Sequence, residues 1–411
     1  MSGLTYLEKL LDGVEVEWKA LGDISLKSYS GGTPRAGNPA YYENGTIPWL
    51  RTQEVKFNDI ESVGVRITQK AVDETAAKWV PANCVIIAIS GATAGRSGIN
   101  KIPLTTNQHC CCLEIDKDIA FYRYVFHWVS RHYETLKNLG QGARGDLNAG
   151  IIKGFLIPIP CPDNPKKSLE IQTEIVRILD AFTAYTAELT AELTARKKQY
   201  HYYRDQLLSF EDGDVEWKTL DHLCINISAG GDVPKNSSKG QTQPSSEYPY
   251  PIYANATDEK GLYGFTDDYK VDTDAVTISA RGAKVGYHTV RAAKFTPIIR
   301  LIVLVANKEL ISTKYLNYVL DMTPIGGTEG GIPQLTVPMV KKITVPIPFP
   351  NNPEKSLAEQ QGIVSILDKF DTLINSMSEG LPREIELRQQ QYEYYRDQLL
   401  SFPKPESESA V

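Results

Sequence analysis

The sequence predicts an α+β chain of 411 residues with a pseudo-two-fold internal repeat, in which two globular domains alternate with two long helices. The main observation is a stretch of nine residues, 202–210, that returns residue for residue as 394–402. Each copy ends a long helical pattern, which begins near Leu169 in the first half and near Leu357 in the second. The stretch before each helix has short strand patterns and turns. Such repetition indicates duplication of one structural unit.

Length and composition fit a folded protein with more than one core. Hydrophobic residues make up 42% and charged residues 23% of the chain, which is typical of soluble proteins. No run approaches the roughly eighteen apolar residues that a membrane span needs, and residues 1–13 lack a signal-peptide pattern. We therefore expect a cytoplasmic protein that does not enter a membrane.

The net charge of −6 argues against a protein that coats nucleic acid indiscriminately. The charge is unevenly distributed, however. Residues 15–155 contain 16 basic and 14 acidic residues, net +2, and residues 215–349 contain 14 and 13, net +1. The acidic excess lies in the helices and termini, so the globular domains are compatible with specific nucleic-acid binding.

The first half begins with a partial third copy of the junction between helix end and globular domain. Residues 1–14 are therefore expected to pack beside the end of the last helix and complete a pseudo-cyclic frame. Residues 15–160 form the first globular domain. Within it, the apolar run 84–89 predicts a buried strand, residues 121–139 predict a helix that ends at Gly140, and residues 155–160 predict an extended edge segment.

A central spacer helix is predicted within residues 161–214, starting near Ser168. From Ile175 to Leu207 its apolar positions alternate at spacings of four and three, the period of a coiled coil, which requires a partner helix. The tetrad Thr-Ala-Glu-Leu occurs twice in succession here, at 186–189 and 190–193.

The second half repeats this plan with a globular domain at 215–350, a distal spacer helix at 351–402 and a tail at 403–411 that is expected to be disordered. The offset between copies is 199 at Trp18 and Trp217, 188 at Leu179 and Leu367, and 192 at Tyr203 and Tyr395. The offset grows from 188 to 192 along the helix, so the second helix is four residues longer than the first. Four residues form a stutter that keeps the seam nearly in phase, with a kink expected at residues 380–382.

Motifs for chemistry are absent from the sequence: it contains no P-loop, dinucleotide fingerprint, zinc-protease motif or nucleophile elbow. The six histidines have no metal-ligand spacing, and the six cysteines fit reduced thiols in apolar strands, with Cys110, Cys111 and Cys112 inside one buried strand. We expect no catalytic residue and no metal ligand in this chain.

One glycine-rich turn occurs in both halves, at residues 91–96 and again at 282–286. Arg281, Lys284, Arg291 and Lys294 lie around the second copy, and no acidic residue occurs between positions 280 and 295. Two interpretations remain: a loop that faces phosphate, or a solvated surface turn.

The junctions and helices resemble the specificity (S) subunit of Type I restriction-modification systems, most closely the IC group. The resemblance spans essentially the whole chain and rests on residues 156–160, 175–180, the tetrad pair and the nine-residue repeat. It implies two target recognition domains of mixed α/β fold, joined by two antiparallel helices that form a coiled coil. Each domain would read one half of a split, asymmetric sequence in double-stranded DNA.

The resemblance also implies partners. Two methyltransferase (M) subunits that methylate adenine with S-adenosylmethionine would dock on the helices, and restriction (R) subunits would add ATP- and Mg-dependent cleavage. This chain itself would bind no cofactor. The residues expected in the coiled coil and docking surface are Leu179, Phe182, Leu189, Leu193, Tyr203, Arg204, Leu207, Leu367, Phe370, Ile374, Tyr395, Arg396 and Leu399.

Polar and basic side chains on loops are the candidate DNA contacts. The segments 33–34, 51–53, 91–96 and 106–108 belong, by similarity, to recurrent parts of such domains, but the second half has no clear counterpart of the last. The full hypothesis comprises Thr33, Arg35, Arg51, Gln53, Thr93, Arg96, Asn107, Gln108, Arg144, Lys235, Asn255, Arg281, Lys284, Tyr287, His288, Arg291 and Lys294.

Two other functions remain open at the level of sequence. The chain could be a coiled-coil scaffold that carries two protein- or glycan-binding modules and has no role with DNA. It could also be an enzyme that uses a nucleotide, which would require turnover by the purified chain alone.

Overall fold

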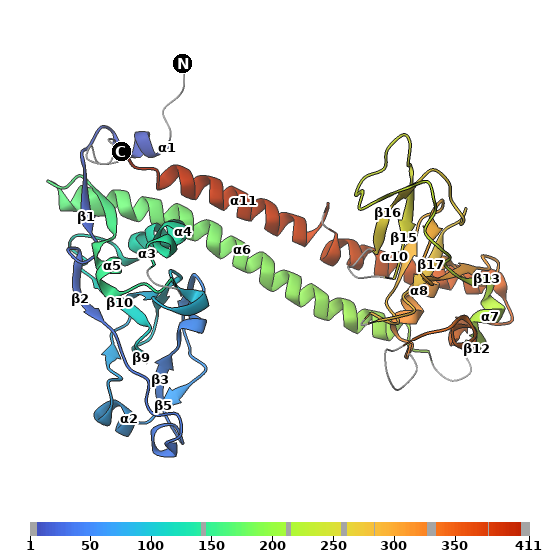
Figure 1. The fold of residues 1–411 in the computed structure, drawn as a ribbon, viewed down its shortest axis with the longest axis horizontal. Coiled ribbons are helices and arrows are strands. Elements are labelled where there is room, and N and C mark those ends of the chain that lie inside the picture. Colours follow the sequence, from blue (N-terminus) through green and yellow to red (C-terminus); the bar gives the residue numbers. More distant parts are fainter. Residues whose placement is uncertain are drawn as a thin grey trace. The chain divides into compact units, whose positions relative to one another are not determined.

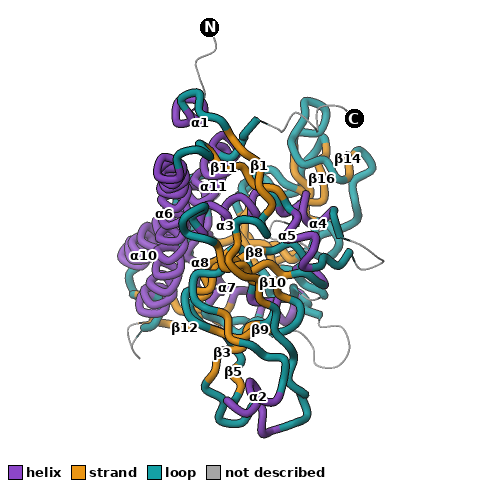
Figure 2. Tube along the Cα trace, turned by 90° about the vertical axis from the view of Figure 1, so that its left-hand side faces the viewer, coloured by secondary structure: helices purple, strands orange, loops and turns teal. Residues whose placement is uncertain are grey.

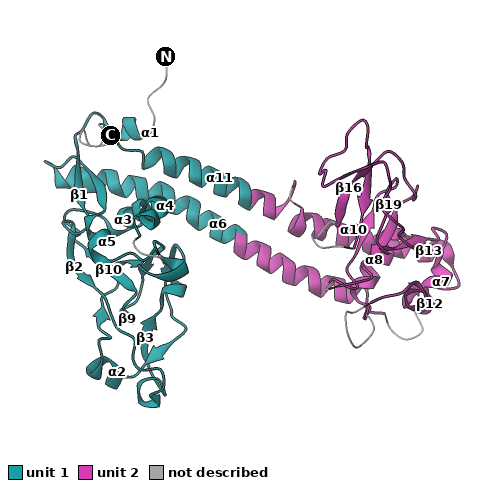
Figure 3. Ribbon diagram, in the orientation of Figure 1, with its two compact units in different colours: residues 1–189, 385–411 teal, residues 190–384 magenta. Residues whose placement is uncertain are grey.

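The computed structural model describes residues 6–140, 145–210, 215–255, 261–282, 284–326, 334–376 and 378–403 (Figure 1). Its contacts divide the chain into two compact units (Figure 3): unit 1 comprises Met1–Leu189 with Ile385–Val411, and unit 2 comprises Thr190–Glu384. The long helix α6 (Pro165–Leu207) is continuous for 43 residues and contributes to both units. The boundary between the units falls between the two Thr-Ala-Glu-Leu tetrads.

Unit 1 contains three sheets. Two sheets share its globular part, and the third is a two-stranded ribbon that joins this part to the helices. The larger sheet has the order β2 (Ser25–Tyr29), β10 (Cys110–Ile115), β7 (Val85–Ala88), β8 (Ser97–Asn100) and β4 (Asn58–Ile60). The smaller has the order β5 (Arg66–Ile67), β3 (Ile47–Leu50), β9 (Leu104–Thr106) and β6 (Trp79–Val80), and the ribbon pairs β1 (Val16–Ala20) with β11 (Leu156–Pro160).

The cysteine-rich strand β10 lies at the centre of unit 1, which confirms the predicted buried strand. Cys111 and Leu113 face one apolar cluster, whereas Cys110 and Cys112 face another. This alternation follows from the two-residue period of a strand. The run 84–89 is likewise confirmed as strand β7, all four residues of which are buried.

Short helices complete unit 1: α1 (Tyr6–Leu11), α2 (Gln69–Glu74), α3 (Tyr122–Arg131), α4 (Tyr133–Asn138) and α5 (Ala149–Gly154), with 3₁₀ turns at Pro39–Tyr41, Thr52–Glu54 and Gly91–Thr93. Figures 1 and 2 show α2 and the smaller sheet at the end of unit 1 that is farther from α6. The single helix expected at 121–139 is divided at His132, whose φ of −94° and ψ of 24° lie outside the α region. The His132 ring also bonds the Trp128 carbonyl oxygen at 2.9 Å, so the side chain competes for a helical acceptor.

Unit 2 repeats the three-sheet plan. One sheet has the order β13 (Cys224–Ala229), β20 (Ile302–Ala306), β17 (Ala275–Ile278) and β18 (His288–Arg291), and another has β14 (Ser237–Lys239), β16 (Leu262–Thr266), β15 (Tyr250–Tyr253) and β19 (Thr296–Pro297). The ribbon pairs β12 (Val215–Thr219) with β21 (Thr344–Pro348), and the helices are α7 (Leu220–Leu223), α8 (Thr313–Asp321), α9 (Val337–Lys341) and α10 (Pro353–Asn375). Helix α8 is the counterpart of α3 and was not among the expected elements.

The spacer helices pair through equivalent aromatic stacks in the two units. In unit 1, Phe182 of α6 stacks on Tyr395 of α11 (Leu381–Leu399) with centroids 5.3 Å apart and an interplanar angle of 21°. In unit 2, Phe370 of α10 stacks on Tyr203 of α6 at 5.6 Å and 27°. The contact of Arg388 with the Tyr185 ring, together with the first stack, shows that α6 and α11 run antiparallel in unit 1. The pairing register therefore survives the four-residue insertion.

Most of the predicted seam lies in the apolar clusters of the two units. Leu179, Leu189, Leu367, Ile374 and Leu399 are buried, and Leu193, Leu207 and Phe370 are partly buried against the same clusters. The distal helix has a break instead of a stutter within a continuous helix, because α10 ends at Asn375 and α11 begins at Leu381. Gly380 closes the break at a φ of 84°, where a Cβ atom would lie 2.5 Å from the Thr372 carbonyl oxygen.

Matching hydrogen bonds join one helix of each globular part to the ribbon of the same unit. Tyr124 of α3 and Tyr315 of α8 donate to the carbonyl oxygens of Pro158 and Pro346 at 2.8 and 3.0 Å. Four residues further along α3 is Trp128, whereas α8 has Val319 at that position. Beside Val319 lies a pocket of about 180 Å³ that is also lined by the exposed Trp217. The tyrosine contacts are therefore the same in both units, whereas the residue four positions later differs.

The N-terminal helix and the end of the chain meet in unit 1, as the partial third copy predicts. Leu7 and Leu11 belong to the same cluster as Leu399 and Phe402. The Trp18 indole N–H donates to the Pro403 carbonyl oxygen at 3.0 Å, so Pro403 is held in place although it was expected in the disordered tail. Residues 404–411 of that tail lie outside the described residues.

Candidate nucleic-acid interface

Loops from several strands meet at one edge of the larger sheet in unit 1. Pairing of Tyr29 with Cys112, of Ala88 with Cys110 and of Ile87 with Ser97 places the ends of β2 and β7 beside the starts of β10 and β8. We call residues 30–35, 89–96 and 107–109 the loop edge of unit 1. This edge brings together the predicted contacts Thr33, Arg35, Thr93, Arg96, Asn107 and Gln108.

Gln108 is the exposed polar side chain at the centre of this loop edge, and its Oε1 accepts from the Thr33 hydroxyl at 2.7 Å. Its neighbour Asn107 is 8% exposed and accepts from the His109 N–H at 3.1 Å, so Asn107 shapes the turn. Gly31 permits the close packing of the loops, since a Cβ there would lie 1.8 Å from the Thr106 carbonyl oxygen.

The glycine-rich turn of unit 1 is closed by an acidic side chain. The Gly91 N–H donates to Asp146 Oδ1 at 3.1 Å. A carboxylate at this backbone donor disfavours a phosphate in the same place, so the structure weakens the phosphate-facing interpretation for unit 1. Arg96 remains half-buried beside the turn, and Arg144 lies outside the described residues.

Arg51 and Gln53 follow strand β3 and adjoin the loop edge through the Asn107 N–H, which bonds the Leu50 carbonyl oxygen at 3.2 Å. The Arg51 Nε lies 3.9 Å from Glu54 Oε2, whereas the Gln53 side chain is exposed. Gln53 is thus the more accessible of the two.

The equivalent edge of unit 2 carries basic and aromatic side chains. Pairing of Ala229 and of Ile278 with Ile302, and of Ile278 with His288, aligns four strand ends as in unit 1. We call residues 230–235, 279–282, 284–287 and 298–301 the loop edge of unit 2. Its exposed cations are Lys235, Arg281, Lys284 and Arg300.

Two of the predicted DNA contacts in unit 2, Asn255 and His288, form hydrogen bonds or ion pairs within the unit. The Asn255 amide donates to the Ile299 carbonyl oxygen at 2.7 Å and accepts from the Ala280 N–H at 2.8 Å, so it ties two loops of the edge together. His288 Nε2 lies 3.2 Å from Asp321 Oδ1. Burial alone disfavours the imidazolium, but the bond with Asp321 raises the pKa of His288 above its ordinary value of 6.5. Tyr287 is half-buried at the same edge.

Arg291 and Lys294 do not lie around the glycine-rich turn, contrary to expectation. Strand β18 begins at the loop edge with His288, and three residues of extended chain carry Arg291 about 10 Å away from it. Arg291 is 8% exposed and its guanidinium lies 3.9 Å from the centroid of the Tyr253 ring, so it packs inside unit 2. Lys294 lies beyond it, over Tyr269.

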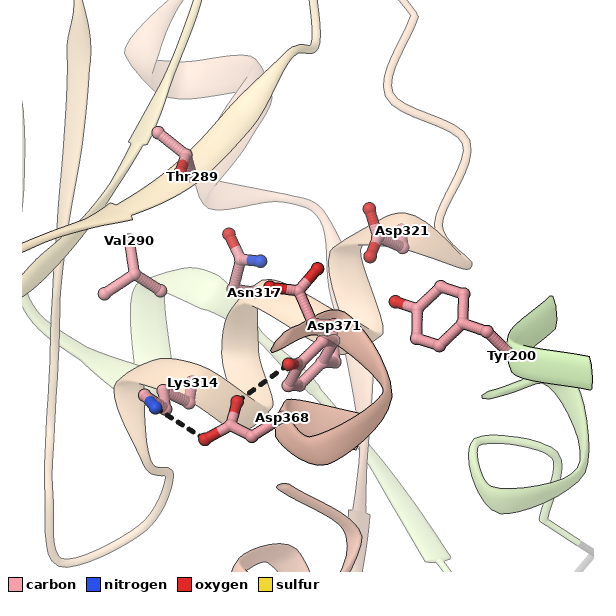
Figure 4. A pocket seen from close by; sticks show the side chains of 9 residues that line it. Tyr200, Thr289, Val290, Lys314, Asn317, Asp321, Asp368 and Asp371 are labelled. Atoms are coloured by element: carbon pink, nitrogen blue, oxygen red, sulfur yellow. Dashed lines mark hydrogen bonds and ion pairs between the residues drawn. The ribbon is translucent and has the colours of Figure 1, made fainter. Parts of the chain in front are cut away.

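A polar pocket of about 270 Å³ in unit 2 has the wrong charge for a phosphate (Figure 4). Asp321, Asp368 and Asp371 line it, and Lys314 and the Tyr318 hydroxyl bond Asp368 at 2.5 and 2.8 Å. These bonds fix α8 to α10. The residues that line the pocket therefore attach the globular part to its helix.

Metal-ligand clusters and reactive cysteines are the groups that could support catalysis in the described part of the chain. No cluster of three or more His, Cys, Asp or Glu suited to a metal ion occurs among those residues. Burial raises the pKa of Cys84 and Cys110 to about 12 and that of Cys111 to about 11, which keeps these thiols protonated and poorly nucleophilic. None of the described helices is long and apolar enough to cross a membrane.

Ile299 and Arg300 belong to the loop edge of unit 2 but were not among the contacts predicted from the sequence. Nothing in the local sequence marks them, since Ile298-Ile299 has the composition of a strand. Their position becomes visible only once β19 pairs with β15 and β20 pairs with β13 and β17, because the turn lies between these two strands.

A duplicated frame whose two loop edges differ in side chains is the architecture of a two-part recognition protein. The family model for the Type I restriction modification DNA specificity domain matches this chain twice, at residues 13–196 and 214–387. The chain is 38% identical over 435 residues to the Type I restriction enzyme EcoR124I/EcoR124II specificity subunit of Escherichia coli, with all of both chains covered. It is 35% identical over 393 residues to the EcoprrI specificity subunit of the same species, covering 92% of this chain and 93% of that subunit.

Solved structures agree on the fold. The S subunit of a Type I restriction-modification system from M. genitalium matches with a TM-score of 0.61 at 14% identity, covering 96% of this chain and 98% of that one. The chain belongs to the family of Type I restriction-modification DNA specificity proteins, and its role is recognition of a DNA sequence. The scaffold interpretation finds no support in these comparisons, and the IC grouping stays a prediction.

Proposed function

We propose that each unit reads one half of a bipartite, asymmetric target in double-stranded DNA through its loop edge. The supporting observation is that the two loop edges have the same strand framework but different chemistry. Unit 1 presents Gln108, Thr33 and one exposed cation, Arg35, whereas unit 2 presents four exposed cations, which are Lys235, Arg281, Lys284 and Arg300. Polar side chains on the loops would contact base edges, and lysine and arginine side chains would contact phosphates and fix the register.

The helices and junctions would dock two methyltransferase subunits, one for each copy of the repeat. Tyr202 and Tyr394 support this proposal, because each is 61% exposed at the same place in its copy. Exposed tyrosines at equivalent positions offer two like surfaces, and tyrosine is enriched at protein interfaces. Arg204 and Arg396 lie next to them, each over the ring of Tyr200 or Tyr392 at 5.9 or 5.8 Å.

The chemistry of the complex would reside on the partner subunits. S-adenosylmethionine would bind the methyltransferase subunits, and ATP and Mg the restriction subunits, while this chain supplies the target. We place the complex in the cytoplasm, where its DNA substrate is accessible.

Single-molecule sequencing of DNA methylation tests this function. The full chain would be expressed with its methyltransferase partner in a host without other adenine methylation. We expect methylated adenines within one sequence made of two short specified blocks and a spacer of fixed length. Expression of the methyltransferase without this chain is the control and should leave the DNA unmodified. Methylation that is absent, or scattered without a two-block sequence, would contradict the proposal.

A further inference from the structure

The turn before strand β20 in unit 2 is strained. Ile299 and Arg300 have φ values of 51° and 59°, in the left-handed region that non-glycine residues avoid. A β-branched residue such as isoleucine is a true outlier there, and backbone strain of this kind occurs at functional sites. Ile299 is nevertheless 52% exposed, and Arg300 is exposed beside it. An apolar side chain is thus held in solvent at a cost in free energy.

Hydrogen bonds hold the backbone of this turn in one conformation. The N–H groups of Ile299 and Arg300 donate to the carbonyl oxygens of Gly231 and Gly230 at 2.8 and 3.1 Å, and the Gly230 N–H donates to the Leu301 carbonyl oxygen at 2.8 Å. Asn255 binds the Ile299 carbonyl oxygen from the other side. Gly230 has to be glycine, since a Cβ would lie 2.7 Å from the Ile298 nitrogen. The two side chains are therefore presented by a rigid support.

The Arg300 side chain is available for a ligand. In the part of the chain that the structure describes, no carboxylate forms an ion pair with its guanidinium, whereas His288, at the start of the neighbouring strand β18, lies 3.2 Å from Asp321. Asn255 also connects this turn to the Ala280 backbone at the start of the basic glycine-rich loop. Arg300 and that loop thus belong to one surface.

Unit 1 has its counterpart of this turn at Gln108. Both turns connect the strand that pairs in parallel with β3 or β15 to the strand β10 or β20. Each turn begins against the first glycine of a Gly-Gly pair, which is Gly31 in unit 1 and Gly230 in unit 2. Unit 1 supports its turn with the buried Asn107 side chain, whereas unit 2 uses strained backbone. The missing counterpart of the Thr-Asn-Gln segment is therefore this Ile299-Arg300 turn, found by topology and not by sequence.

We propose that Arg300 determines specificity in the second half of the DNA target, by donating to O6 and N7 of one guanine in the major groove. Ile299 packs beside it against the methyl group of a neighbouring thymine. Arginine is suited to guanine in this bidentate geometry, and apolar side chains to the thymine methyl. By the same argument, Gln108 reads an adenine in the first half. This inference rests on the proposed function and assigns residues to it.

The test compares four variants of the full chain in its complex with the methyltransferase: Arg300→Lys, Arg300→Gln, Ile299→Gly and Lys294→Ala. Arg300→Lys keeps the charge but loses the planar fork, and Ile299→Gly keeps the left-handed backbone without the side chain. Lys294→Ala is the matched control, because Lys294 is an exposed cation at a φ of 69° outside the loop edge. Methylated motifs are mapped by sequencing, and binding is measured on duplexes that differ at single positions.

We expect both Arg300 variants to lose about tenfold to a hundredfold of discrimination at one position of the second half-site, with the first half-site and the spacer unchanged. Ile299→Gly should relax an adjacent position, and Lys294→Ala should keep the wild-type motif. If Arg300→Gln keeps the full motif, or if both Arg300 variants weaken binding equally on all duplexes, Arg300 does not read a base and the inference is wrong while the proposed function stands. If the wild-type complex methylates no two-block sequence, the proposed function fails first.

Discussion

At the scale of single residues, two buried glutamines hold the globular parts on their helices in the same way. Gln172 accepts from the Phe121 N–H at 2.8 Å and donates to the Ile119 carbonyl oxygen and the Ser168 hydroxyl. Gln360 repeats this pattern with Ser312, Leu310 and Ser356. Both side chains are fully buried. An amide with every donor and acceptor engaged specifies one position of the loop on the helix.

Replacing either glutamine by leucine is expected to lower the free energy of unfolding by about 2–4 kcal/mol, because a buried N–H and a buried carbonyl lose their partners. Gln172→Leu and Gln360→Leu should have similar effects, since the bonds are alike. Gln389→Leu, at an exposed position of α11, is the control and should change stability by no more than about 0.5 kcal/mol. Denaturant unfolding of the full chain measures all three, and an equal loss for the control would contradict this account.

Residue roles of this kind were only partly predictable. The sequence places Gln172 near a helix start, but its partner lies 51 positions earlier and is set by the fold. Ile299 has a positive φ, although its β-branched side chain predicts a negative one. Gln108 was selected by similarity to a recurrent segment of the family, and Lys284 because it is a basic residue within a glycine-rich turn. Arg291 was selected by the same reasoning, although strand β18 carries it into the interior.

At the scale of elements, Asp180 and Asp368 occupy equivalent positions on α6 and α10 but hold different partners. Asp180 binds Arg123 at 2.5 and 2.8 Å and His127 at 2.8 Å, and Arg123 also reaches Asp59. Asp368 binds Lys314 and the Tyr318 hydroxyl. Burial alone would raise the pKa of Asp180, but its bonds to His127 and Arg123 lower it below the ordinary 3.8.

Asp180→Asn should therefore destabilise unit 1 by about 2 kcal/mol or more, because Arg123 and His127 are largely buried and lose a charged partner. Asp368→Asn should cost about 1 kcal/mol, since the side chain of Lys314 is 56% exposed. A carboxylate whose folded pKa is lowered stabilises the fold at pH above its unfolded value, and this contribution disappears as the pH falls toward the folded value.

The stability difference between wild type and Asp180→Asn should consequently shrink as the pH drops below about 4. Denaturant unfolding at a series of pH values measures it. A difference that stays constant from neutral pH down to pH 3 would show that the Asp180 charge is not the source of the stabilisation.

Elements with a strong period were the easiest to predict, and pairings between distant segments the hardest. The seam of α6 follows from the spacing of its apolar residues, and the buried strand β7 follows from an apolar run rich in valine and isoleucine. The break at 376–380 was expected only as a kink, because sequence offsets count inserted residues without showing whether the helix absorbs them. The mixed sheets depend on parallel pairs such as β3 with β9, which no local pattern encodes.

At the scale of the whole molecule, the duplication separates what is shared from what differs. Two features recur in both units: the aromatic stack, Phe182 on Tyr395 or Phe370 on Tyr203, and the close approach of Gly31 or Gly230 to the neighbouring turn. The loop edges carry Gln108 in one unit and Arg300 in the other. Under the proposed function, a common frame with different loop-edge side chains would let one chain recognise an asymmetric sequence.

The tetrad pair within α6 gives the last prediction, which concerns the distance between the two half-sites. Both Thr-Ala-Glu-Leu tetrads are helical, and the boundary between the compact units falls between them. A third tetrad inserted after Leu193 adds about 6 Å of helix, close to two base-pair steps of roughly 3.4 Å each. Four residues also keep the apolar seam nearly in phase, so the inserted helix still pairs.

We therefore expect the spacer of the methylated motif to lengthen while both half-sites stay the same, as mapped by sequencing methylated adenines in cells that express the longer chain. An insertion of four alanines at the same place is the matched control for length, because alanine keeps the helix and adds the same rise. It should lengthen the spacer equally if distance is what matters. A spacer that remains unchanged in both variants would mean that α6 does not set the separation of the half-sites.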